Sequence, residues 1–297
     1  MSPAANSPDD KLHSERVLIV DFGSQVTQLI ARRVREAGVY SEIAPFTQAE
    51  EAFHRLQPKG IILSGSPASV CDEDSPRAPQ ILFDSGLPIL GICYGQQVMM
   101  QMLGGKVERG HGTAEFGRAY VKPTEERIDL LKGWFLEERE QVWMSHFDSV
   151  ASVGPQFEEL GWTDLGSGHR HRYAAIGSDS LRRYGFQYHA EVDATVGGDR
   201  MIANFVQDIC GCEPTWNLET YLAEQLTDIR DQVGDQSVFL LASGGVDSTV
   251  AAKILHQALG PGRVKLLHID NGLMRQDEST SVLAMFKDLG LGDDLHF

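Results

Sequence analysis

Cysteines, long apolar runs and the apolar core of a signal peptide are all scarce or missing in this 297-residue chain. No run approaches the roughly 18 apolar residues that a membrane helix needs, so no membrane segment is predicted. The polar first residues lack a signal core, so we expect a disordered tail over residues 1–15 and a cytoplasmic protein. The cysteines are too few and too unevenly spaced for a disulfide framework: Cys71, Cys93, Cys210 and Cys212.

Positive charge is also in short supply. Lysine and arginine number 26 against 42 aspartates and glutamates, which gives a formal net charge of −16. Such a chain repels phosphate backbones, so a nucleic-acid partner is not expected. The chain also lacks the Gly-Lys-Ser/Thr ending of a Walker A loop. Hydrophobic residues make up 42% of the chain, enough for a sizeable core, and the length predicts two domains.

Short apolar runs followed by turns or helical patterns make up the first third of the chain. The runs Val17–Asp21, Gly60–Leu63 and Pro88–Ile92 are typical of strands buried on both faces. Their alternation with helices predicts an α/β fold with an open, mostly parallel sheet and flanking helices. Between about residues 106 and 190 shorter alternating pieces indicate further strands, partly antiparallel. A helix is expected over Asp199–Ile209.

A second unit is expected after a linker at residues 211–218. A helix over Glu219–Gln232 precedes a strand at Ser237–Ala242, another helix and a strand at Val264–Ile269. We therefore predict one domain over residues 16–210 and a Rossmann-like domain over residues 219–297. Two complete strands are few for a parallel sheet, so only the opening part of that second domain is expected here.

Cys93 stands where a buried strand meets a helix, within Gly91-Ile-Cys-Tyr-Gly95. The pattern has the form of the G-x-S-x-G nucleophile elbow with cysteine in place of serine. Glycines on both sides let the chain reverse sharply, and the positive end of the helix favours a thiolate. A buried structural cysteine is the alternative, and the position at this junction favours a nucleophile.

His189 and Glu191 are candidates for a base and its orienting carboxylate. Residues two apart in an extended segment project to the same side, so the imidazole and the carboxylate are expected to face one another. On this spacing alone, a polar edge strand is the simpler interpretation.

Two segments resemble the class I glutamine amidotransferases: Gly91-Ile-Cys-Tyr-Gly-Gln-Gln97 and Tyr188-His-Ala-Glu-Val192. Within that class, Asp21-Phe-Gly-Ser-Gln25 and Val142-Trp-Met-Ser-His146 are similar to segments of the GMP synthase family. The resemblance implies that Cys93 is the nucleophile, His189 the general acid/base and Glu191 its orienter. It further implies residues that bind the oxyanion and the substrate L-glutamine: Gly65, Ser66, Tyr94, Gln97, Ser145 and His146.

The chain departs from that family's pattern at two positions. The family's His-Pro-Glu is His189-Ala-Glu191 here, and its Gly-Gly-Pro oxyanion strand is Gly65-Ser-Pro67. Alanine keeps both functional side chains. Serine keeps the backbone N–H that would face the oxyanion, but it adopts a positive φ less readily than glycine does.

A second motif, Ser243-Gly-Gly-Val-Asp-Ser248, follows a buried strand and opens a helix. Small residues there let backbone N–H groups converge on an anion at the helix N-terminus, although a plain glycine-rich turn is the alternative. The whole pattern resembles the pyrophosphate loop of N-type ATP pyrophosphatases. This resemblance implies that Asp247 helps to place Mg²⁺ and that His268–Arg275 lies near the nucleotide. The implied ATP-binding residues are Ser243, Gly244, Gly245, Val246, Asp247, Ser248 and Thr249.

The two motifs together imply the reaction of the GMP synthase family. Glutamine hydrolysis supplies ammonia, Mg-ATP adenylates xanthosine 5′-monophosphate (XMP), and ammonia displaces AMP to give GMP. Glutamine, ATP and XMP are thus the implied substrates. The family forms homodimers through a C-terminal domain that we do not expect in this chain, and we expect the chain to retain only the glutaminase half.

Three alternatives compete with this interpretation. A stand-alone glutaminase, such as an anthranilate synthase partner, would have no use for Ser243–Ser248. An asparagine synthetase would carry its nucleophile as an N-terminal cysteine, whereas this chain begins Met1-Ser2. A weakly active or regulatory fragment that binds glutamine and ATP stays open.

Overall fold

The computed structural model describes residues 15–110, 114–124, 128–135, 138–166 and 169–297. They form two compact units, which divide between Trp216 and Asn217. The predicted tail lies outside the described residues except for its last residue, Glu15. The Glu15 carboxylate is buried and accepts hydrogen bonds from Lys59 Nζ at 2.5 and 2.8 Å, so this residue is part of the folded unit.

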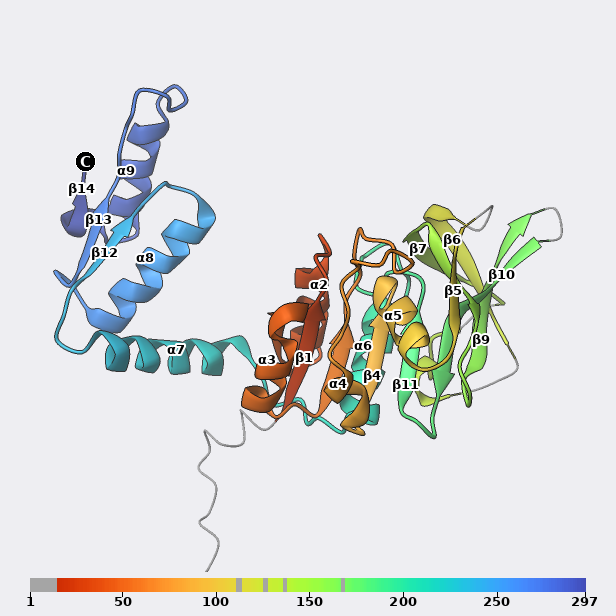
Figure 1. Cartoon of the computed structure of the whole chain (residues 1–297). Coiled ribbons are helices and arrows are strands. Elements are labelled where there is room, and N and C mark those ends of the chain that lie inside the picture. The colour runs from red at the N-terminus through yellow and green to blue at the C-terminus, as the bar shows by residue number, and fades with distance from the viewer. Residues whose placement is uncertain (1–14, 111–113, 125–127, 136–137, 167–168) are drawn as a thin grey trace, which may run out of the picture. The chain divides into compact units, whose positions relative to one another are not determined.

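A mixed sheet forms the centre of the first unit (Figure 1). Neighbouring strands are parallel from β2 to β11 and antiparallel from β11 to β7. The predicted α/β fold with a parallel sheet and flanking helices is therefore confirmed, with an antiparallel extension. In spatial order the strands are β2 (Tyr40–Pro45), β1 (Arg16–Asp21), β3 (Gly60–Leu63), β4 (Ile89–Ile92), β11 (Arg183–Phe186), β10 (His169–Ser178), β9 (Glu158–Gly166), β6 (Glu115–Pro123) and β7 (Glu140–His146). A separate antiparallel pair consists of β5 (Lys106–Arg109) and β8 (Asp148–Ser152).

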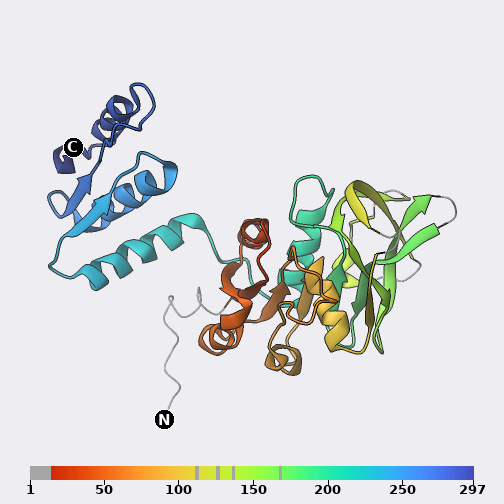
Figure 2. The same cartoon turned by 45° about the horizontal axis from the view of Figure 1, so that its top comes forward.

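Helices cover both faces of the parallel half of this sheet (Figures 1 and 2). Alternate residues of β1 enter two separate cores. Val17 and Ile19 pack with residues of α2 and α6, whereas Leu18 and Val20 pack with residues of α3, α4 and α5. Because each face buries its own apolar layer, the strand is a continuous apolar run. The helices are α2 (Thr27–Glu36), α3 (Ala49–Leu56), α4 (Gln80–Asp84), α5 (Tyr94–Met102) and α6 (Gly198–Ala203), with 3-10 turns η1 (Phe46–Gln48) and η2 (Asp129–Leu131).

The helix predicted over Asp199–Ile209 is not uniform. Helix α6 ends at Ala203 and continues as a π-helical stretch, η3 (Asn204–Ile209). Phe205 and Val206 of η3 are fully buried in the same core as α2. The wider turn therefore keeps its apolar side against the sheet, a packing requirement that helical periodicity does not reveal.

The segment around His189 is a turn, which corrects the extended conformation expected for it. Strand β11 stops at Phe186, and the residues after it form bends and turns. Gly198 lets the chain fold back closely here, because a Cβ at that position would lie 1.9 Å from the carbonyl oxygen of Ala190. The turn follows the carboxyl end of a central strand, the edge of the sheet where ligands bind in open α/β folds.

The second unit is a fragment of an α/β fold within its described residues, with one hydrophobic core. Strands β12 (Val238–Leu241), β13 (Val264–Leu267) and β14 (Leu295–His296) are parallel. Its core includes Ala252, Leu266 and Phe286, all fully buried. The helices are α7 (Leu218–Val233), α8 (Val246–Leu259) and α9 (Glu278–Asp288), with a 3-10 turn η4 (Gly292–Asp294). Within the part of the chain that the structure describes, no helix is both long enough and apolar enough to span a bilayer.

Candidate functional site

Cys93 occupies a strained backbone conformation between β4 and α5, with φ 53° and ψ −107°. Its neighbours explain why the chain can take this shape. A Cβ on Gly91 would lie 2.5 Å from Gln96 N, and one on Gly95 would lie 2.2 Å from the carbonyl oxygen of Leu63. Only glycine fits at either position, so the predicted elbow is present in the structure. Residues held in such sparsely populated conformations cluster at functional sites.

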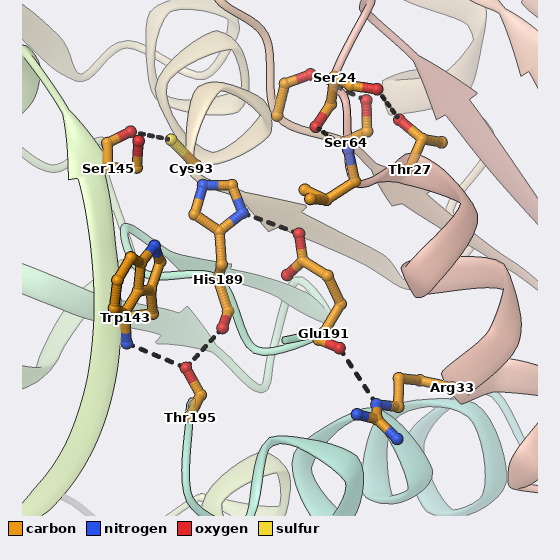
Figure 3. A network of polar contacts seen from close by, with 12 residues as sticks. Ser24, Thr27, Arg33, Ser64, Cys93, Trp143, Ser145, His189, Glu191 and Thr195 are labelled. Carbon is orange, nitrogen blue, oxygen red and sulfur yellow. Dashed lines mark hydrogen bonds and ion pairs between the residues drawn. The ribbon is translucent and has the colours of Figure 1, made fainter. Parts of the chain in front are cut away.

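His189 and Glu191 form a buried pair beside Cys93. His189 Nδ1 lies 2.7 Å from Glu191 Oε1, and the Glu191 side chain has no exposed surface. Figure 3 shows the imidazole between the cysteine sulfur and the carboxylate. The turn is held by Thr195, whose hydroxyl donates to the His189 carbonyl oxygen at 2.6 Å, and by Arg33 Nε, which donates to the Glu191 carbonyl oxygen at 3.1 Å.

The surroundings of His189 favour its protonated form. Burial alone would lower the pKa of the imidazole, but hydrogen bonding to Cys93 and Glu191 outweighs it and raises the pKa to about 10. The ring is therefore an imidazolium at neutral pH, facing the sulfur on one side and the carboxylate on the other. Because the pKa of His189 is raised on folding, its protonated ring contributes fully to the stability of the fold below about pH 6.5, the ordinary pKa of histidine. This contribution is lost as the pH rises through about 10.

A pocket of about 440 Å³ opens in front of the Cys93 sulfur. Gly65 is not among the residues that line it, but a Cβ at Gly65 would come within 3.3 Å of His189 Cε1, so glycine leaves room for the ring. The Cys93 thiol donates to the carbonyl oxygen of Ser145 at 3.6 Å. The pocket brings together five further predicted site residues, which its lining includes: Ser66, Tyr94, Gln97, Ser145 and His146.

The side chains of Gln97 and His146 already have partners within the protein. Gln97 Nε2 donates to the carbonyl oxygen of Asp148 at 2.7 Å. His146 Nδ1 lies 3.0 Å from that same oxygen, and His146 Nε2 lies 3.4 Å from Glu115 Oε2. His146 is buried, whereas the Ser145 side chain is exposed. Asp148 thus organises this wall of the pocket, a role that its sequence context does not suggest.

Ser66 adopts a backbone conformation open to any residue, since it is absent from the described non-glycine residues with positive φ. The concern that serine would be strained at this position is therefore wrong. Its hydroxyl donates to the carbonyl oxygen of Phe22 at 2.8 Å and accepts from the N–H of Ala68 at 3.1 Å. The side chain thus fastens the segment after β3 to the segment after β1.

Several residues of the site were not found by sequence reasoning. Gln187 is fully buried, and its Nε2 donates to Cys93 Sγ at 3.7 Å. Phe116 and Phe147 stand at the pocket rim, 59% and 69% exposed, with their rings edge to face at 4.8 Å. Gln187 precedes His189 by two positions, which is the only hint of its place in the sequence.

The second motif forms a loop between β12 and α8. Gly244 has φ 82°, and a Cβ there would lie 2.3 Å from Val282 Cγ2. The Ser243 and Ser248 hydroxyls lie 3.1 Å apart, and Thr249 Oγ1 donates to the Gly245 carbonyl oxygen at 2.8 Å. The Gly245 N–H donates to Ser243 Oγ at 3.3 Å and the Thr249 N–H to the Gly245 carbonyl oxygen at 3.1 Å. The N–H groups of Val246–Ser248 stand in the first turn of α8, at the helix N-terminus where an anion is favoured.

Asp247 and His268 border this loop in different ways. Asp247 is exposed in the first turn of α8. His268 is buried, with Nδ1 2.8 Å from the Ala242 carbonyl oxygen and Nε2 3.2 Å from Ser279 Oγ. Among the described residues no group of three or more His, Cys, Asp or Glu side chains is arranged to hold a metal ion. A single carboxylate beside bound phosphates is how Mg²⁺ is commonly held, and Asp247 fits that arrangement.

Replacement of Ser66 should lower the free energy of unfolding least for threonine, more for alanine and most for glycine. Ser66→Ala removes two hydrogen bonds and should cost about 1 kcal/mol of unfolding free energy. Ser66→Gly adds chain entropy to that loss and should cost about 1–2 kcal/mol. Ser66→Thr keeps the hydroxyl and should lie closest to the original protein. Chemical denaturation of the four proteins measures the order, and a Ser66→Gly variant more stable than the original would contradict it.

Replacement of Glu191 should lower the pKa of His189. Burial lowers the pKa of His189, and the Glu191 carboxylate is one of the groups that raise it. Glu191→Gln removes that negative charge, so the effect of burial is less fully offset. The imidazolium should then deprotonate well below pH 10. An NMR titration of the histidine ring protons measures the shift, with a His189 variant to assign the signal. The matched control is Glu159→Gln, because Glu159 pairs with Arg172 rather than with a histidine. An unchanged His189 titration would show that Glu191 does not set its charge.

Comparison with known families identifies two matching regions. The model "Glutamine amidotransferase class-I" matches residues 18–209, and the NAD synthase model matches residues 218–294. The glutamine-hydrolyzing GMP synthase of Rhizobium johnstonii is 52% identical over 277 residues, which are 93% of this chain and 52% of that protein. That of Zymomonas mobilis is 50% identical over 285 residues, 96% of this chain and 53% of that protein. The chain therefore spans about half the length of these curated relatives.

Solved structures agree on the fold of the first unit. A crystal structure from Thermoplasma acidophilum, assigned to one component of a GMP synthase, is 25% identical with a TM-score of 0.55, covering 67% of this chain and 95% of that one. A glutamine amidotransferase of Methylobacillus flagellatus is 16% identical with a TM-score of 0.52, covering 67% of this chain and 96% of that one, and shows likeness of fold. Since the amidotransferase model matches well over half of its residues, the chain belongs to the class-I glutamine amidotransferase family.

Proposed function

We propose that the first unit hydrolyses L-glutamine and that it serves as the glutaminase half of a glutamine-dependent GMP synthase. One observation carries the glutaminase proposal: the strained Cys93 faces a pocket and is flanked by the buried pair of His189 and Glu191. A nucleophile, a base within reach and a group that orients the base are the parts that covalent amide hydrolysis requires. The similarity to GMP synthases over 93% of the chain supports the larger role.

In the proposed mechanism His189 first acts as an acid. The Cys93 thiolate attacks the side-chain amide carbon of glutamine and a C–S bond forms. The His189 imidazolium gives its proton to the amide nitrogen, the C–N bond breaks, and ammonia leaves a thioester on Cys93. Neutral His189 then takes a proton from water, the resulting hydroxide attacks the thioester, and glutamate leaves as the thiolate is restored. Glu191 holds the ring and favours its charged form in each cycle.

The proposed oxyanion site consists of the backbone N–H groups of Ser66 and Tyr94. Tyr94 opens helix α5, so its N–H also carries the positive potential of the helix N-terminus. The Ser66 hydroxyl fixes its own backbone through Phe22 and Ala68, at a position where the family has glycine. Donors of this kind are typically worth about 2.7–4 kcal/mol of the activation barrier.

Glutamine itself is proposed to bind against Gln97 and the backbone of Ser145 and His146. The Gln97 Nε2 group is already occupied by Asp148, so its Oε1 is the atom left to accept a hydrogen bond from the substrate. The His146 ring is held within the protein, and this residue therefore contributes through its backbone. Phe116 and Phe147 at the rim supply apolar surface that covers the methylene groups of the substrate.

The second unit is proposed to bind ATP through Ser243–Thr249, with Mg²⁺ near Asp247, as part of the domain that activates XMP for amination in the GMP synthase family. Its basis is the anion-binding loop at the start of α8 and the similarity to GMP synthases. Bound Mg²⁺ would neutralise charge on the phosphates. The cytoplasmic location stays a prediction. A weakly active or regulatory fragment remains the second candidate, and the rate of glutamine turnover separates the two.

Removal of the Cys93 thiol should abolish glutamine hydrolysis, because no covalent path remains. Cys93→Ala should also lose labelling by glutamine-like electrophiles such as a diazo-ketone analogue. Serine variants of Cys71, which is exposed, and of the buried Cys210 are the controls and should keep turnover and labelling. Glutamate release and the mass of labelled peptides are the measurements. Undiminished hydrolysis in Cys93→Ala would refute the proposed nucleophile.

Replacement of Gly244 should weaken Mg-ATP binding. In Gly244→Ala a left-handed backbone costs about 1–2 kcal/mol and the added methyl group meets Val282, so binding should fall about tenfold or more. The control is Gly260→Ala at the other end of α8, where φ is 83° and no atom lies within 4 Å of the added Cβ. Isothermal titration with Mg-ATP measures both. Equal affinities in the two variants would place the nucleotide elsewhere.

A further inference from the structure

Gln187 is a buried side chain whose two polar atoms both have partners in the site. It lies just after β11, at the carboxyl edge of the sheet, and has no exposed surface. Its Oε1 accepts a hydrogen bond from Gln97 Nε2 at 3.2 Å, and its Nε2 donates to Cys93 Sγ at 3.7 Å. The side chain therefore links a wall of the pocket to the sulfur.

The orientation of the Gln187 side-chain amide follows from the donors and acceptors around it. The Asp148 carbonyl oxygen can only accept, so Gln97 must turn its NH₂ group toward it, and that bond is 2.7 Å. The other hydrogen of the same NH₂ group needs an acceptor, which the oxygen of the Gln187 amide supplies. Gln187 must then point its own NH₂ group at Cys93. The sulfur thus faces a donor that cannot be exchanged for an acceptor by rotating the amide.

A fixed donor at this place treats the two charge states of the sulfur differently. As a thiol, Cys93 donates its own hydrogen to the Ser145 carbonyl oxygen at 3.6 Å. As a thiolate it has no hydrogen to give, and that carbonyl dipole repels it. Hydrogen bonds to an ionised acceptor are roughly twice as strong as those between neutral groups. The Gln187 N–H therefore gains strength when the proton leaves, and burial keeps water from replacing it.

We propose that Gln187 is a catalytic residue that stabilises the Cys93 thiolate by a direct N–H···S hydrogen bond, with Gln97 and the Asp148 carbonyl fixing its direction. The inference rests on the proposed role of Cys93 as nucleophile. His189 and Glu191 supply the charge that faces the sulfur from one side, and Gln187 supplies a neutral donor from within the sheet edge. Because Gln97 also belongs to the proposed glutamine site, the same chain of hydrogen bonds connects the substrate wall to the nucleophile.

The test measures how fast Cys93 is alkylated by iodoacetamide at each pH, using the full chain and counting the Cys93 peptide by mass spectrometry. Gln187→Met keeps the length of the side chain and removes the donor. Gln187→Glu keeps the shape and places a carboxylate beside the sulfur. The matched control is Gln96→Met, because Gln96 is equally buried on the same helix as Gln97 but donates to the Tyr173 carbonyl oxygen instead.

The proposal expects Cys93 alkylation near pH 7 to fall about tenfold in Gln187→Met, with the profile shifted to higher pH by about one unit. Gln187→Glu should shift it further, because a second negative charge is placed beside the thiolate. Gln96→Met should match the original profile. Unchanged profiles in both Gln187 variants would overturn the proposal, as would an equal shift in Gln96→Met, which would mean that packing alone is responsible.

Glutamine turnover measured on the same samples separates this inference from the function on which it rests. If the original chain hydrolyses no glutamine while the Gln187 variants still shift the alkylation profile, the donor is present and the glutaminase proposal fails. If turnover is normal and the profile does not respond to Gln187, the glutaminase proposal stands and this inference fails. Where Gln187→Met does not fold, the isosteric Gln187→Glu carries the test.

Discussion

The close approach of helix α5 to strand β3 is the constraint on which the first site depends. No side chain fits at Gly95, because its Cβ would lie 2.2 Å from the Leu63 carbonyl oxygen, and Gly91 is similarly confined. With the helix this near the sheet, the chain must turn at Cys93 through a positive φ. That conformation costs of order 1–3 kcal/mol, and the apolar layers on both faces of the parallel strands offset it. The rigid core thus holds the sulfur clear of the sheet.

The charged groups beside the Cys93 sulfur are buried, which is unfavourable for the stability of the fold. Glu191 is fully buried, and its Oε2 is among the described buried atoms with no hydrogen-bond partner. A buried carboxylate is unfavourable unless a cation faces it. His189 is that cation, and the same ring faces Cys93 on its other side. One imidazolium therefore stabilises a buried anion within the fold and a second anion that the chemistry would form.

Local features of the site were predictable from sequence, whereas its long-range contacts were not. The elbow at Cys93 follows from apolar runs and glycine spacing, which are properties of a few adjacent residues. The pairing of His189 with Glu191 was expected for an extended segment, yet it occurs in a turn whose shape depends on Gly198. Two residues apart, side chains can meet in either backbone, so the expected contact did not require the expected conformation.

Gln187 and Asp148 show why the rest of the site lay beyond sequence reasoning. Their contacts with Gln97 join residues 90 and 51 positions apart, and they depend on the order of strands in the sheet. Runs of apolar residues predict that strands exist but not that β11 lies between β4 and β10. The negative φ of Ser66 is a further case, because residue type gives a preference for φ and the surrounding hydrogen bonds decide it.

The position of β11 also has a consequence for the order of events during synthesis. This strand enters the sheet beside β4 although much of the chain separates them, and Gln187 and Cys93 are 94 positions apart. A nascent chain that has only reached the antiparallel strands exposes the Cys93 segment before its acid, carboxylate and amide donor have been made. Domains fold as units and largely in order of synthesis. Late insertion of one strand thus delays assembly of the reactive cluster until nearly the whole first unit has left the ribosome.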